Sequence, residues 1–117
     1  MGSKYYNYPN TAVCVLELSG SLRYSHQDEL NQLEKTLSEM GIQSRLLIHQ
    51  TDKDLEIDST GFKKLLSKLA FLDNEHKAKI AFSNVTGKFE TYLEQSKLDQ
   101  RYKKYSSIEE AIGALND

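Results

Sequence analysis

The chain has 117 residues, of which 38% are hydrophobic and 27% charged, and its formal net charge is −2 at pH 7. This size and composition are ordinary for one globular domain, and the slightly acidic balance argues against a nucleic-acid binder, which would carry a basic excess. The single cysteine, Cys14, excludes an internal disulfide and favours a reducing compartment. Because no apolar stretch resembles a transmembrane helix or a signal peptide, we expect a cytoplasmic protein without a membrane span.

The N-terminal part of the chain predicts a strand followed by a helix. Residues 1–10 are rich in tyrosine and turn formers, and they form either a short edge strand or a loose tail. The run from Ala12 to Leu18 is nearly continuously apolar, as is typical of a strand buried on both faces. Ser25 and Asp28 have the spacing of a capping box, with Asp in place of Glu, so a helix is expected to begin at Ser25. Gly41 is a suitable stop for that helix.

A turn that contains two hydroxyl residues and a carboxylate follows in the middle of the chain. Arg45 to Ile48 predicts a second buried strand, and Leu55 to Ile57 is β-like. The tetrapeptide Asp58-Ser59-Thr60-Gly61 comes next, directly before an amphipathic helix expected from Phe62 to Leu72. The unpaired N–H groups and the positive dipole end of a helix N-terminus favour negative charge. The tetrapeptide is therefore suited to carry charge or a hydroxyl-linked modification.

The C-terminal part continues the alternation of strands and helices. Lys77 to Phe82 predicts a third main strand, a weaker helix follows, and Arg101 to Tyr105 predicts a last short strand. Ser107 and Glu110 form a full capping box at the start of the final helix. The whole pattern predicts an α/β fold in a single domain over residues 11–117. We expect a mostly parallel or mixed sheet of four to five strands, covered by about four helices.

Four motifs resemble, in order, the STAS domain of bacterial anti-sigma factor antagonists. They are VCVLELSGSLRYSHQDELNQL, LEIDSTGF, AKIAFSNV and KKYSSIEEAIGAL. Each motif is weak alone, because a sequence such as D-S-T-G occurs by chance in many chains. Their order and spacing are more specific, and they cover roughly residues 11–116. The resemblance implies a STAS-like fold and a non-enzymatic role in signal transduction and transcription regulation.

The resemblance also implies a phosphorylation switch. In the antagonists the acceptor is the hydroxyl residue directly after the motif Asp, which is Ser59 here. Thr60 is a second candidate, because related scaffold-type STAS domains use threonine. The resemblance implies that an anti-sigma factor with serine kinase activity binds the unmodified domain, and that an added charge of about −1.5 to −2 beside Asp58 releases it. The residues predicted to contact the partner are Asp58, Gly61, Phe62, Lys63 and Lys64.

The chain departs from the pattern of the antagonists in three places, which leaves a second interpretation open. Arg23 stands where an acidic residue is common, His49 and Gln50 stand where the second strand commonly ends in Asp, and Lys63 replaces a small residue. These changes favour a constitutive subunit of a transport or scaffold complex, or a carrier of a small ligand or lipid. In that case Ser59 is only a helix cap, since Asp58, Ser59 and Thr60 are all residue types that commonly cap helices. A hydrolase that uses Ser59 is a third class, but no base can be assigned to it.

No cofactor or metal is expected from the remaining motifs. The acidic residues between Asp52 and Asp58 do not match a calcium loop, which would need Gly at Ile57 and Glu at Lys63. The three histidines lack the spacing of zinc ligands, and the six glycines are scattered singly. We expect a monomer or a weak dimer.

A basic cluster near the C-terminus has two interpretations. It consists of Lys97, Arg101, Lys103 and Lys104, with Tyr102 and Tyr105 between and beside them. It could dock an acidic partner or a phospholipid head group. We prefer the simpler interpretation, an edge strand that lysines protect from pairing.

Overall fold

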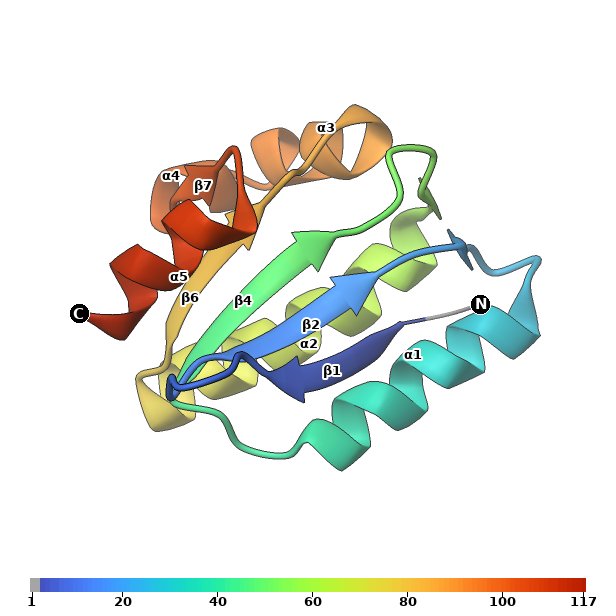
Figure 1. The fold of residues 1–117 in the computed structure, drawn as a ribbon. Helices are drawn as coiled ribbons and strands as arrows, with labels where there is room; N and C mark the ends of the chain where they lie inside the picture. The colour runs from blue at the N-terminus through green and yellow to red at the C-terminus, as the bar shows by residue number, and fades with distance from the viewer. Residues whose placement is uncertain (1–2) are drawn as a thin grey trace.

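The computed structural model describes residues 3–117, which form a five-stranded sheet with helices on both faces (Figure 1). The strands lie in the order β1-β2-β4-β6-β7; β1 is antiparallel to β2 and the others are parallel. Their bounds are β1 (Lys4–Asn7), β2 (Cys14–Leu18), β4 (Arg45–Gln50), β6 (Lys79–Ser83) and β7 (Lys104–Tyr105). A separate parallel pair consists of β3 (Ser21–Leu22) and β5 (Glu56–Ile57). The predicted α/β architecture with a mostly parallel sheet is confirmed.

Helices cover the two faces of the sheet unequally. They are α1 (Gln27–Met40), α2 (Ser59–His76), α3 (Gly87–Gln95), α4 (Leu98–Arg101) and α5 (Ile108–Asn116). The larger core lies between the sheet and α1, α2 and α3, whereas α5 packs on the opposite face (Figure 1). In β4, Leu46 and Ile48 belong to the larger core and Leu47 to the smaller one. Both faces of this strand are therefore buried, which explains its continuous apolar run.

Two helix starts test the capping predictions. Ser107 is the N-cap of α5, and its Oγ accepts a hydrogen bond of 3.2 Å from Glu110 N, so this prediction is confirmed. The predicted cap at Ser25 is wrong, because α1 begins at Gln27 after His26. The His26 backbone N–H bonds Arg23 O at 2.9 Å, and its ring nitrogen lies 2.6 Å from Ser21 Oγ. Residues 23–26 therefore form a turn, and α1 begins at Gln27, two residues after the predicted start at Ser25.

Other boundaries also differ from the predictions. Strand β2 begins at Cys14 instead of Ala12, and β4 ends at Gln50 instead of Ile48. Helix α2 begins at Ser59 and ends at His76, because the cap at Asp58 brings the following residues into the first turn. Lys77 adopts a left-handed conformation that ends α2, so β6 begins only at Lys79. The strand expected over 101–105 is shortened to β7, because residues 98–101 form the helical turn α4. This extra turn gives five helices in residues 3–117 instead of about four.

Strand β1 lies at the edge of the sheet and pairs with β2 from Lys4 to Asn7. This is the edge-strand alternative that the sequence left open for residues 1–10. Met1 and Gly2 lie outside the described residues.

Candidate functional site

The turn between β5 and α2 is organised by the carboxylate of Asp58. Asp58 is the N-cap of α2 and has extended backbone angles. Its Oδ1 accepts hydrogen bonds of 3.1 Å from both Thr60 N and Gly61 N. The first N–H groups of a helix have no acceptor within the helix, and Asp58 supplies one for two of them. The cap of α2 is therefore Asp58, and Ser59 is the first residue of the helix and not its cap.

The second carboxylate oxygen of Asp58 holds a distant loop. Its Oδ2 accepts a hydrogen bond of 2.8 Å from Tyr24 N, which is 34 residues away in the sequence. Partial burial acts to raise the pKa of Asp58, but the three backbone N–H bonds and the nearby positive charge of Arg23 outweigh it. The pKa of Asp58 is therefore below its ordinary value, and the carboxylate is ionised at neutral pH. One charged group thus fixes both the start of α2 and the loop before α1.

Gly61 allows α2 to lie close to β3. A Cβ atom added at this position would overlap the backbone carbonyl oxygen of Leu22. Leu22 in turn pairs with Ile57, the residue before Asp58. A glycine is thus required here, because α2 and the small β3–β5 pair approach each other closely. The Cα of Gly61 faces Leu22 and is buried.

The predicted site residues fall into exposed and internal groups. Ser59 is exposed and Thr60 is partly buried, and Lys63 is exposed in the first turn of α2. Lys64 forms an ion pair with Glu34 of α1. Phe62 is only 6% exposed, and its ring stacks on Tyr92 with centroids 5.1 Å apart. Contact of Gly61 and Phe62 with a partner stays a prediction, but the structure gives both residues an internal packing role.

Arg23 and Tyr24, two residues that interact with Asp58, were not predicted as site residues. Tyr24 is 67% exposed and Arg23 is also exposed, and both lie in the loop that Asp58 holds. Exposed aromatic and arginine side chains are enriched in protein interfaces. No local sequence signal joins this loop to the tetrapeptide, because the links are the β3–β5 pairing and the bond from Tyr24 to Asp58, both between segments about 34 residues apart. We call the exposed group Arg23, Tyr24, Ser59 and Lys63, together with Asp58, the α2 corner.

His49 and Ser83 lie close together on the face of the sheet that α5 covers. His49 Nδ1 lies 2.7 Å from Ser83 Oγ, and Glu17 pairs with His49 across the neighbouring strand. Burial lowers the pKa of His49, although Glu17 and Glu109 act to raise it. The three residue types are those of a hydrolase triad, but Ser83 is fully buried and a substrate cannot reach its hydroxyl. The arrangement is better explained as a polar link between β2, β4 and β6.

Two further properties of the described residues concern metal ions and membranes. Among residues 3–117, no three His, Cys, Asp or Glu side chains come close enough together to hold a metal ion. Over the same residues, no helix combines the length and the apolar character needed to cross a membrane.

The comparisons with known proteins identify the fold. No protein-family model matches the chain, and no curated protein matches it. An anti-sigma-factor antagonist (STAS) domain protein from Planctomyces limnophilus has a similar structure, with a TM-score of 0.76 and 22% identity over 100% of both chains. The phosphorylated form of the Bacillus cell fate determinant SpoIIAA gives a TM-score of 0.72 and 16% identity, with 96% of this chain and 97% of that chain covered.

A third solved structure comes from a different kind of protein. A sulfate transporter family protein from Wolinella succinogenes matches with a TM-score of 0.63 and 14% identity, over 94% of this chain and 88% of that one. The shared architecture defines the class: this chain has the STAS fold, as the four motifs predicted.

Proposed function

We propose that the chain is a non-enzymatic regulatory domain that binds a protein partner through the α2 corner and is switched by phosphorylation of Ser59. The observation that carries the proposal is the position of Ser59, exposed at the first residue of α2 and directly after the ionised Asp58. Two proteins of the same fold support it, since one is described as an anti-sigma-factor antagonist and the other was solved in a phosphorylated form. Thr60 is the second candidate acceptor, and its partial burial makes it the less accessible one.

The charges of the corner explain how such a switch would work. The N–H groups of Thr60 and Gly61 are already bonded to Asp58, so they are less free to stabilise a second anion. A phosphoryl group on Ser59 would add a charge of about −1.5 to −2 beside that carboxylate. A partner surface that fits Arg23, Tyr24 and Lys63 in the unmodified protein would then meet a strongly negative site. Loss of binding follows from this change of charge.

The similarity to anti-sigma factor antagonists supports an inference about the class of partner. We infer an anti-sigma factor with serine kinase activity, so that one protein both binds the corner and modifies it. The domain would then regulate bacterial transcription by sequestering that factor, and a phosphatase would restore the unmodified state.

The proposal is tested by incubating the protein with ATP and a lysate of its native organism, followed by intact mass and peptide analysis. We expect a gain of one phosphate, located on Ser59, which the Ser59→Ala variant does not acquire. A matched control is Ser67→Ala, because Ser67 is also an exposed serine of α2 but lies two turns further along. A phosphate that persists in Ser59→Ala and is absent from Thr60→Ala assigns the switch to Thr60. Unmodified protein, or a phosphate independent of both residues, contradicts the proposal.

A constitutive subunit of a transport or scaffold complex is the alternative function. The transporter-family protein of the same fold favours it, as do Arg23 and His49, which depart from the pattern of the antagonists. A constitutive subunit would bind its partner with equal affinity whether position 59 is Ser, Ala or Asp. The affinity series at position 59 therefore separates the two functions.

A further inference from the structure

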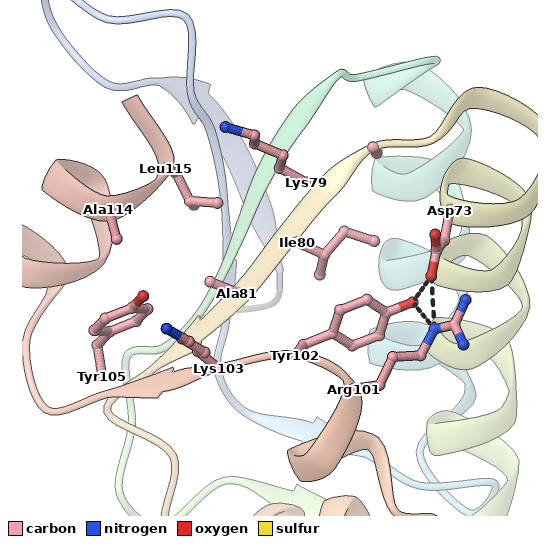
Figure 2. Close-up of a pocket in the computed structure, with 11 residues that line it drawn as sticks. Asp73, Lys79, Ile80, Ala81, Arg101, Tyr102, Lys103, Tyr105, Ala114 and Leu115 are labelled. Carbon is pink, nitrogen blue, oxygen red and sulfur yellow. Dashed lines mark hydrogen bonds and ion pairs between the residues drawn. The ribbon is translucent and has the colours of Figure 1, made fainter. Parts of the chain in front are cut away.

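A groove of about 470 Å³ lies near the C-terminal end of α2, along one edge of β6 (Figure 2). Its walls come from α2, β6, the segment between α4 and β7, and α5. Ser59 and Asp73 are 14 positions apart on α2, which at 1.5 Å per residue places the groove about 20 Å from the α2 corner. It is therefore a second surface, separate from the proposed phosphorylation site.

The edge of β6 in this groove has free backbone groups. Strand β7 pairs with β6 only at Phe82 and Ser83, so among the described residues no strand covers Lys79–Ala81 on this side. The N–H groups of Phe82 and Asn84 point to this edge, because each donates a 3.0 Å bond to the β7 segment. In a parallel sheet, the N–H and C=O of one residue both point to the same neighbouring strand, and those of the next residue point to the opposite one. Ile80 lies two residues before Phe82 and so has the same orientation. The N–H and C=O of Ile80 therefore face the groove.

The walls of the groove suit the side chains of an extended peptide. Figure 2 shows the Tyr102 ring beside Ile80 on one side, and Ala114, Leu115 and Tyr105 on the other. Side chains of a strand point alternately to the two faces of its sheet. A segment added to β6 would therefore place alternate side chains against Tyr102 and against the last turn of α5.

Positive charge surrounds this edge. Lys79, Arg101 and Lys103 line the groove, and Asp73 is the one acidic residue among its lining residues. Asp73 is already bound, since it accepts a 2.7 Å bond from Arg101 Nε and a hydrogen bond from the Tyr102 hydroxyl. Lys79 Nζ donates to the backbone oxygen of Asp117 at 3.1 Å, and Lys103 is exposed. The groove thus offers lysine charge to an incoming chain.

We propose that this groove binds an extended acidic segment of a partner protein, which adds as a strand to the free edge of β6. Backbone bonds to Ile80 would give the register, and Lys79 and Lys103 would select acidic side chains. A second copy of this chain fits less well, because pairing of two β6 edges would bring the lysines of both copies together. The edge-protection interpretation of the basic cluster explains the repulsion of such a copy, whereas the apolar walls and the free groups of Ile80 are features of a binding groove.

The test uses the full chain, labelled with ¹⁵N, and an acetylated and amidated peptide of the sequence Glu-Val-Glu-Val-Glu-Val. We expect saturable shifts at the groove, and hydrogen exchange of the Ile80 amide that slows about tenfold at saturation, because the amide gains a strand partner. The peptide Lys-Val-Lys-Val-Lys-Val, with the same backbone and opposite charge, should not bind. Absence of a saturable shift, or saturation without protection of Ile80, overturns the proposal.

Variants separate the groove from unspecific charge. Lys79→Glu combined with Lys103→Glu should weaken binding of the acidic peptide by about tenfold or more, equivalent to about 1.4 kcal/mol. Lys35→Glu combined with Lys88→Glu is the matched control, because both are exposed lysines that do not line the groove, and it should leave the affinity unchanged. Equal weakening by both changes contradicts a specific groove. Vesicles of phosphatidylserine that bind through Lys79 and Lys103 when the peptide does not would assign the surface to a membrane and overturn the proposal.

Discussion

The two ends of α2 are each held by a carboxylate, but with different kinds of partners. Asp58 at the N-terminal end accepts three bonds from backbone N–H groups, whereas Asp73 near the C-terminal end accepts bonds from the side chains of Tyr102 and Arg101. Backbone donors are fixed by the fold, while an exposed arginine must give up rotamer freedom to bind. The α2 corner is therefore a preformed surface, whereas the groove has the more adaptable wall.

The largest effect should come from Gly61→Ala, a substitution in the first turn of α2. The added methyl group overlaps the carbonyl of Leu22, so α2 must move away from β3, and we expect a loss of about 3 kcal/mol in the free energy of unfolding. Urea denaturation measures it. The matched control is Gly113→Ala in α5, where nothing lies within 4 Å of an added Cβ and the change should be neutral or stabilising by about 0.5–1 kcal/mol. Equal effects of the two substitutions would contradict the close approach at Gly61.

Removing each carboxylate in turn compares the two ends of the helix. Asp58→Ala removes the cap and releases the Tyr24 loop, and should cost about 2 kcal/mol of unfolding free energy. Asp73→Ala removes the bonds from the Tyr102 hydroxyl and from the half-exposed Arg101 and should cost about 1 kcal/mol, less than Asp58→Ala. Chemical denaturation of the two variants under the same conditions tests the order. If Asp73→Ala is the more destabilising change, the groove and not the corner is the rigid end.

Acid should also distinguish the corner. The pKa of Asp58 is lowered in the folded protein, so the unfolded chain binds more protons and the stabilisation is present above the ordinary pKa of about 4. It is lost as pH falls through the lowered folded pKa. The pKa of Asp73 is lowered too, first by the Tyr102 hydroxyl and then by Arg101, so Asp58→Asn should reduce the slope of stability against pH below about pH 4 without abolishing it. Urea midpoints measured from pH 5 to pH 2 give the slope, and an unchanged slope contradicts the capping role.

The features that could be predicted from the sequence are those set by neighbouring residues. The caps at Asp58 and Ser107 involve residues two or three positions apart, so the order of residue types contains the information. The buried strands β2 and β4 could be predicted because both of their faces are covered. The wrong start at Ser25 reflects the turn before α1, in which the His26 ring meets Ser21 five positions earlier, a spacing that the capping-box pattern does not describe.

The features that could not be predicted are built from distant segments. The bond from Tyr24 to Asp58 joins residues 34 positions apart, and the pair of His49 and Ser83 joins two strands through their register. The helical turn α4 is too short to show periodicity, and its formation exposes the edge of β6. The groove therefore depends on four elements whose meeting no local pattern describes.

The central claim is that the α2 corner binds a partner until Ser59 gains charge, and calorimetry with the partner captured from the native lysate tests it most directly. The account predicts that Ser59→Ala binds like the unmodified wild type and that Ser59→Asp binds at least about tenfold more weakly, a difference of about 1.4 kcal/mol. Ser67→Asp, which places the same charge two turns along α2, should retain full affinity. Equal affinities of Ser59→Ala and Ser59→Asp would contradict the switch and support the constitutive subunit.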